Sequence, residues 1–160
     1  MTLNGAGQSP GVFSTILNLT LNGNVGQIAV PPGTYGSFIA NGTSGFTLGT
    51  AGSTVPEVYD FQGLILNSGT HVSVVGPVIV VLASSFTVNG GTVGAPAQPT
   101  WLQLNIASGG LTLNGGATLA GLVTAPGGTV VLDGSSVLTG ALECNQLTIN
   151  SSCVLQGPGE

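Results

Sequence analysis

A short motif recurs along the whole chain and constrains its fold more than any other feature. The motif reads apolar, variable, apolar, then Asn or Asp, then Gly or Ser. It occurs eight times, and successive occurrences lie 17 to 26 residues apart. Such recurrence is typical of solenoids, in which each repeat is one structural unit stacked on its neighbours. The Asn or Asp of the motif falls at positions 4, 22, 41, 67, 89, 114, 133 and 150.

Each motif is expected to form one short β-strand followed by a turn. Two apolar residues flank an outward-facing one with the two-residue period of a strand, and Asn-Gly is a strong turn signal. The 28 Gly and 9 Pro residues disfavour long helices. Strands that recur without crossover helices predict parallel stacking, with one winding of the chain per repeat and ~4.8 Å between coils.

The last three repeats predict two further strands in each coil. Residues 117–121 align with 136–140 and with 153–157, and residues 122–125 match 141–144. Three short strands per coil indicate a roughly triangular cross-section. We therefore predict an all-β fold, a single parallel β-helix (β-solenoid) domain of about eight coils over residues 1–160. Loops are expected to leave the coils at residues 49–57 and 94–100, because both segments interrupt the repeat with turn residues.

Stacking of the repeats predicts where the motif side chains point. The Asn and Asp residues should lie above one another at one corner, where Asn tolerates left-handed backbone and amides can hydrogen-bond along the stack. The Thr residues at 20, 87, 112 and 148 should face outward. The expected corner ladder comprises Asn67, Asn89, Asn114, Asp133 and Asn150. The expected inward residues are Leu19, Leu21, Leu64, Leu66, Phe86, Val88, Leu111, Leu113, Val130, Leu132, Leu147 and Ile149.

The charge composition excludes several functions. The chain has no Lys or Arg, five acidic residues and one His, which gives a formal net charge of −5. Without cations it cannot neutralise phosphates, so nucleic-acid binding is excluded, and attraction to anionic lipid is missing as well. The apolar runs stop far short of the ~20 residues of a membrane-spanning helix, so no membrane insertion is expected. A chain without trypsin-type cleavage sites suits an extracellular or cell-surface location.

Candidate catalytic and metal-binding residues are few. Glu57 and Asp60 lie three residues apart near a predicted loop, but carboxylate chemistry on β-helices also uses a basic residue, which this chain lacks. We interpret them as solvated positions and weak contact candidates, with calcium binding as a weaker alternative. His71 aligns with Thr118, Val137 and Val154, which predicts a wall position. No catalytic residue, metal or cofactor is expected, and the chain is not expected to be an enzyme.

The cysteines and aromatic residues leave alternatives open. Cys144 and Cys153 lie near the end of the chain on what we expect to be neighbouring coils, so they form either a disulfide or two buried free thiols. Trp101 follows the Pro-rich loop, and together with Tyr59 it is a candidate contact residue for a surface glycan. Aromatic residues make up only 5% of the chain and are spread over different coils, whereas sugar platforms need neighbouring rings.

Several stretches resemble a known group of proteins. The runs LTLNG, VVGPVIVVLA and CNQLTIN are similar to right-handed β-helix domains of exported and pilus-associated bacterial surface proteins. The resemblance covers roughly residues 25 to 157. It implies a right-handed winding and a place at the bacterial cell surface, and it offers no catalytic motif. A weaker likeness is to bactofilins, which are β-helical proteins that polymerise end to end without a nucleotide.

The ends of the repeat array suggest a function. The motif begins at residue 1 and the repeat still runs at Leu155, and no amphipathic cap or secretory signal is evident. An open coil exposes unpaired strand edges and apolar core, which head-to-tail stacking of copies would bury. We expect a non-enzymatic extracellular structural protein that self-assembles into a filament or forms a stalk. The alternatives are a surface adhesin or glycan-binding module and, for the open ends, a fragment of a larger protein.

Overall fold

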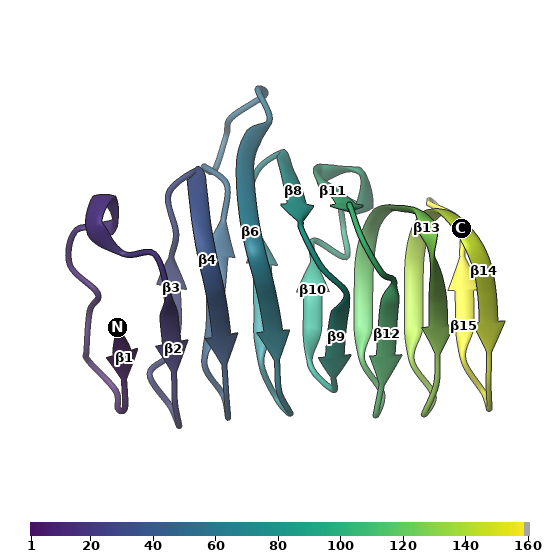
Figure 1. The fold of residues 1–160 in the computed structure, drawn as a ribbon, viewed down its shortest axis with the longest axis horizontal. Helices are drawn as coiled ribbons and strands as arrows, with labels where there is room; N and C mark the ends of the chain where they lie inside the picture. Colours follow the sequence, from purple (N-terminus) through teal and green to yellow (C-terminus); the bar gives the residue numbers. More distant parts are fainter. Residues whose placement is uncertain (159–160) are drawn as a thin grey trace.

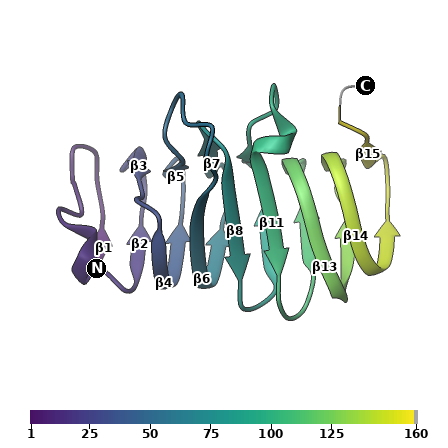
Figure 2. The same ribbon diagram turned by 90° about the horizontal axis from the view of Figure 1, so that it is seen from above.

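The structure, a computed structural model, describes residues 1–158. Within these residues the chain winds into a stack of about seven turns, close to the eight coils predicted, and neighbouring coils pair in parallel (Figure 1). The predicted β-solenoid is therefore confirmed. The chain descends along the near wall and rises along the far wall as it advances toward its C-terminal end, which is a right-handed winding (Figures 1 and 2).

Each complete coil contributes a strand to three walls. The first wall contains β1 (Thr2–Leu3), β2 (Leu19–Leu21), the second halves of β4 (Gly33–Ala40) and β6 (Glu57–Leu66), β9 (Phe86–Asn89), β12 (Leu111–Asn114) and the last parts of β13 (Thr118–Leu132) and β14 (Val137–Ile149). The second wall contains β3 (Gln27–Ala29), β5 (Gly45–Leu48), β7 (His71–Val74), β10 (Thr92–Gly94), the first parts of β13 and β14, and β15 (Val154–Gln156). The third wall contains the first halves of β4 and β6, β8 (Val78–Leu82), β11 (Leu102–Ile106) and the middle parts of β13 and β14.

Two short 3-10 helices lie outside the walls. Helix η1 (Phe13–Thr15) belongs to the long connection between β1 and β2, and η2 (Pro99–Trp101) belongs to the connection between β10 and β11. The latter connection and the one between β5 and β6 correspond to the two loops expected from the sequence at 94–100 and 49–57. Both loops therefore project from the solenoid without changing the register of the coils that they join.

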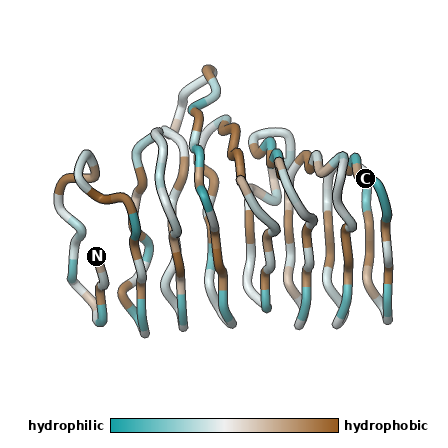
Figure 3. Tube along the Cα trace, viewed as in Figure 1, coloured by the Kyte–Doolittle hydropathy of each residue, from teal (hydrophilic) through white to brown (hydrophobic). Residues whose placement is uncertain are grey.

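The core is a column of apolar side chains enclosed by the three walls. Buried and partly exposed positions alternate along wall strands such as β8 and β12, which is the pattern of a wall with one buried face. Hydrophobic residues recur in coil after coil (Figure 3). The motif residues predicted to face inward are buried from Leu19 through Leu132. Aromatic rings fill the wider coils of the N-terminal half, where Tyr35, Phe38 and Phe61 lie in mutual contact with ring centroids 4.8 to 5.4 Å apart.

The turn after each first-wall strand explains why the motif ends in Gly. Gly23 and Gly134 have φ values of 65° and 61°, in the left-handed region that disfavours residues with a Cβ. A Cβ on Gly134 would also lie 2.6 Å from the backbone nitrogen of Gly115 in the preceding coil. The glycine therefore permits both the turn and the close stacking of one corner on the next.

The strands differ from the sequence expectation in the last coils. We expected three separate short strands per coil, but β13 and β14 each run continuously through all three walls. Corner glycines allow this, because the backbones of Gly121 and Gly140 stack so closely that a Cβ on Gly140 would collide with the carbonyl of Gly121. The pairing of β13 with β14 is interrupted only between Ala125 and Thr129, where the register shifts.

Candidate assembly surface

The last coil exposes side chains that are buried in every complete coil. Leu147 and Ile149 occupy the inward slots of the first wall, paired with Val130 and Leu132. Val130 and Leu132 are both 0% exposed, whereas Leu147 is 38% and Ile149 46% exposed. Both side chains occupy the inward register predicted from the sequence. They are exposed because no further coil covers them in the described residues. Together they make an apolar patch at the end of the solenoid.

Strand segments that pair on one side only flank this patch. Within residues 1–158, residues 141–144 and 146–149 of β14 pair with β13 and with no other strand. We call these two segments the C-terminal edge. Leu155 of β15 adds a third half-exposed apolar side chain, in the slot where Leu138 is fully buried one coil earlier. Within the described residues, the C-terminal edge therefore combines strand segments paired on one side only with half-exposed core side chains.

The opposite end of the solenoid is only partly open. Residues 5–18, which we call the N-terminal cover, form an irregular connection that includes η1. Ile16 of this cover is buried, Phe13 packs against the core, and Leu3 of β1 is only 7% exposed. The sequence analysis expected no cap at this end. That expectation is wrong for the core side chains, because the N-terminal cover buries them. The strand β1 itself still pairs on one side only, with β2.

The corner Asn and Asp residues stack in one column, and part of the column forms an amide ladder. Asn22, Asn41 and Asn67 each donate an Nδ2 hydrogen bond of 2.7 to 2.8 Å to the Oδ1 of the Asn one coil earlier, beginning at Asn4. Asn114 donates to Asn89 over 3.3 Å. This arrangement arises because parallel, in-register coils place identical amides side by side.

Asp133, near the end of the column, makes a different hydrogen bond. Asp133 lies in register between Asn114 and Asn150. Its Oδ1 accepts a hydrogen bond of 2.8 Å from the backbone N–H of Gly134, within its own turn. An ionised carboxylate has no donor to offer along a ladder, so Asp133 contributes to the turn of its own coil.

The possible disulfide is not formed. Cys144 and Cys153 are both free thiols, half-buried at the C-terminal end, and the Sγ of Cys153 accepts the backbone N–H of Ser136 at 3.2 Å. The segment 146–149 lies between the two cysteines and at ~3.3 Å per residue separates them by more than ~10 Å. Bridged cysteines need Cα atoms within ~7 Å of each other. Because they occupy opposite ends of one first-wall strand, the disulfide alternative is wrong for this structure.

Tyr59 and Glu57 anchor the loop between β5 and β6. The buried hydroxyl of Tyr59 donates to Oε2 of Glu57 at 3.0 Å and accepts the backbone N–H of Gly49 at 2.9 Å. Burial raises the pKa of Tyr59 to about 12. Its ring is fully buried, so the expectation that Tyr59 contacts a ligand is wrong. Glu57 and Asp60 are half-buried on the wall. Within residues 1–158 they are not part of any group of three or more acidic, His or Cys side chains that could hold a metal ion.

Trp101 and His71 occupy the outer layer of the solenoid. Trp101 ends η2, is half-buried, and packs against the core, with η2 lying against β13 and β14. His71 lies on the second wall in register with Gly45 and Thr92, as its alignment with Thr118 predicts, and its Nδ1 is 2.8 Å from Oγ1 of Thr92. Both residues therefore serve wall packing in this structure.

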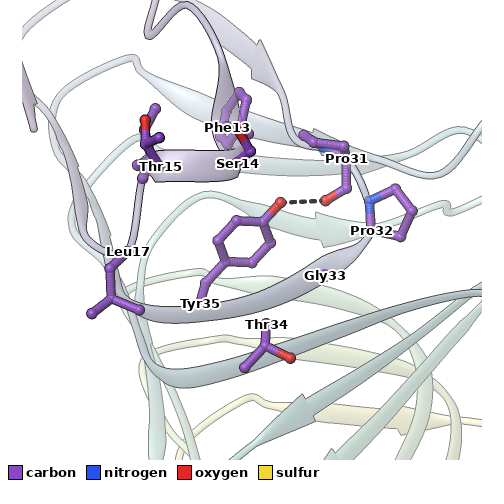
Figure 4. Close-up of a pocket in the computed structure, with 10 residues that line it drawn as sticks. Phe13, Ser14, Thr15, Leu17, Pro31, Pro32, Gly33, Thr34 and Tyr35 are labelled. Atoms are coloured by element: carbon purple, nitrogen blue, oxygen red, sulfur yellow. Dashed lines mark hydrogen bonds between the residues drawn. The ribbon is translucent and has the colours of Figure 1, made fainter.

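A pocket of about 460 Å³ lies beside the N-terminal cover (Figure 4). It is bounded by η1 on one side and by residues 31–35 on the other. The ring of Tyr35 projects into it beneath Phe13, the two rings meeting edge to face at 6.2 Å, and the Tyr35 hydroxyl donates to the carbonyl of Pro31 at 2.7 Å. All lining residues are uncharged, and Ser14, Thr15 and Thr34 add hydroxyls. The sequence analysis missed this pocket, because it depends on how an irregular connection folds back.

Residues 1–158 contain neither a metal-binding cluster nor a helix that could span a membrane. In that part of the chain, no three His, Cys, Asp or Glu side chains gather in a way that would hold a metal ion. No helix there has the length and hydropathy needed to span a membrane. No protein-family model, curated protein or solved structure matches the chain. The function proposed below therefore rests on the geometry of the solenoid itself.

Proposed function

We propose that this chain is a non-enzymatic structural protein of the cell exterior, and that it associates end to end into a filament or a surface stalk. One observation carries the proposal. The C-terminal edge presents Leu147 and Ile149 to solvent beside segments of β14 that pair on one side only within the described residues, and Leu155 of the adjacent β15 is half-exposed as well. Exposed strand edges of this kind are templates for pairing with another chain, and proteins that remain monomeric usually protect them.

A second copy of the chain supplies a complementary surface. The strand β1 has one unpaired side, and it belongs to the same wall and runs in the same direction as the last part of β14. Stacking β1 of one copy on residues 146–149 of another would continue the first wall with the parallel pairing found in every coil. The contact is heterologous, since two different ends meet, so it propagates into a linear polymer.

The charge distribution supports this association. The whole chain carries only five acidic residues and no Lys or Arg, so edge protection by Lys is missing. Of the acids in the described residues, Glu143 alone lies on the C-terminal edge. Little electrostatic repulsion opposes the approach of two ends, and assembly should therefore change only weakly between low and moderate salt.

The proposal is tested by sedimentation velocity over a range of protein concentrations. Ile149→Lys places a charge in the exposed inward slot of the C-terminal edge and is expected to abolish growth of the sedimentation coefficient with concentration. Ile65→Lys is the matched control, because Ile65 is also 46% exposed but lies on the outside of the first wall in a middle coil. A wild-type chain that sediments as a monomer at all concentrations contradicts the proposal.

The pocket beside the N-terminal cover favours a second candidate, a surface adhesin or glycan-binding module. Its volume is in the range of small-ligand sites, and its mixture of aromatic rings and hydroxyls with no charge suits a neutral sugar. Titration with neutral oligosaccharides, followed by intrinsic fluorescence or calorimetry, tests this candidate. Ser14→Trp should fill the pocket and remove binding, whereas Ser84→Trp, which lies on another coil, should not.

A further inference from the structure

At five ladder corners, the backbone N–H of the Asn or Asp residue follows one rule. The N–H of the corner Asn or Asp donates to the carbonyl of the residue that precedes the corner in the coil before. Asn22 donates to Leu3, Asn41 to Leu21, Asn67 to Ala40, Asp133 to Leu113 and Asn150 to Leu132, over 2.8 to 3.0 Å. Each of these five N–H groups therefore points toward the N-terminal end of the solenoid and donates to a carbonyl of the preceding coil.

The first coil satisfies this rule with a substitute. The N–H of Asn4 donates to Oε1 of Gln8 over 2.6 Å. Gln8 belongs to the N-terminal cover, and its side-chain carbonyl takes the role that a backbone carbonyl plays in later coils. The substitute is local and exposed, because Gln8 and Asn4 both lie at the surface and are four residues apart. A carbonyl from another chain can replace it without unfolding any wall.

From these bonds we infer the register of the junction between two copies, an inference that rests on the proposed end-to-end association. The carbonyl that replaces Gln8 is that of Ile149 in the preceding copy, since Ile149 precedes the corner residue Asn150. This choice sets Thr2 beside Thr148, Leu3 beside Ile149 and Asn4 beside Asn150. The side chain of Gln8 is then a competitor that must release Asn4 before the junction closes.

Three features of the strands agree with this register. Leu3 enters the inward column of Leu132 and Ile149, so the exposed side chain of Ile149 becomes buried. Thr2 and Thr148 both stay on the outer face. A shift by one residue would turn Leu3 outward, because side chains alternate along a strand. Asn4 would meet Asn150 in the geometry that Asn22 and Asn4 share within one copy, which continues the amide ladder across the junction.

Disulfide trapping tests the register. Cys144→Ala and Cys153→Ser first remove the native thiols, and sedimentation confirms that this background still assembles. Thr2→Cys and Thr148→Cys are then combined. Neighbouring parallel strands lie ~4.8 Å apart, within the Cα separation that a disulfide spans. Mild oxidation should yield a ladder of covalent oligomers. Thr2→Cys with Thr112→Cys, an outward residue of a middle coil, should give none.

The outcomes separate the register from the proposed function. If the background chain does not assemble, the end-to-end association itself is wrong. If it assembles but Thr2→Cys crosslinks with Gln146→Cys instead of Thr148→Cys, or with neither, association stands and the register is overturned. Gln8→Ala provides a second readout. Removing the competitor should lower the concentration at which assembly begins by roughly two- to tenfold, and a higher concentration would contradict the role assigned to Gln8.

Discussion

Asn67 donates a side-chain hydrogen bond of 2.7 Å to Oδ1 of Asn41, which lies one coil earlier and itself donates to Asn22 over 2.8 Å. Asn41 is therefore a central rung that takes part in two amide bonds, whereas Asn89 takes part in one longer bond with Asn114. The column thus contains rungs of unequal strength at equivalent positions of the repeat. This difference makes the ladder open to a direct comparison.

Replacing Asn41 by Ala should lower the free energy of unfolding by about 1–3 kcal/mol, because two hydrogen bonds are lost and their partners are left in a partly buried corner. Asn89→Ala is the matched control at the same corner, and it should cost less than ~1 kcal/mol. Urea unfolding followed by circular dichroism measures both. Equal losses would show that the amide bonds contribute little beyond the turn preference that both residues share.

The inward and outward slots of the first wall should differ sharply in their tolerance of truncation. Leu113 is completely buried, so Leu113→Ala should cost on the order of 2–5 kcal/mol through lost burial and the cavity that it leaves. Thr112 is its neighbour on the outer face, and Thr112→Ala should cost under ~1 kcal/mol. Denaturant midpoints of the two variants give the comparison, and similar losses would contradict the assignment of the wall faces.

High pH should destabilise the fold through its buried tyrosines. Burial raises the pKa of Tyr59 to about 12, with the hydrogen bond from Gly49 opposing and Glu57 adding to the increase. Below pH ~10 both the folded and the unfolded chain keep the phenolic proton. Between pH 10 and 12 the unfolded chain loses it while the folded chain retains it, so stability falls with rising pH. Burial also raises the pKa of Tyr35, which acts in the same direction.

Tyr59→Phe isolates the contribution of Tyr59. The free energy of unfolding of the wild type should fall more steeply between pH 10 and pH 12 than that of the variant, since Phe has no proton to lose. The comparison uses the slope, because the variant also loses the two hydrogen bonds that hold the loop and starts from a lower stability. Parallel slopes in wild type and variant would show that Tyr59 does not titrate as described.

The sequence was informative wherever one repeat constrained the next. Asn114 and Asp133 could be aligned by eye because parallel stacking preserves register, and the same logic correctly placed Leu132 in the core and His71 on a wall. It failed where the repeat stops. Ile149 is exposed because no coil covers it within the described residues, and Leu3 is buried by an irregular connection that has no periodic signal.

The contacts of side chains outside the repeated motif could not be predicted from the sequence either. Tyr59 is of a residue type that often contacts ligands, but hydrogen bonds to Glu57 and Gly49 hold its side chain inside the solenoid. These bonds depend on how the loop packs, which the sequence does not show. Cys144 and Cys153 are nine positions apart, a spacing that fits adjacent coils or opposite ends of one strand equally well. The role proposed for Gln8 could not be predicted from the sequence either, because it follows from comparing its bond to Asn4 with the backbone bonds at later corners.

Negative-stain electron microscopy of the purified chain tests the central claim most directly. End-to-end association predicts unbranched filaments one solenoid wide, whose mean length increases with protein concentration and falls to single particles in Ile149→Lys but not in Ile65→Lys. Uniform single particles of the wild type at high concentration would contradict the account, as would filaments that persist unchanged in Ile149→Lys.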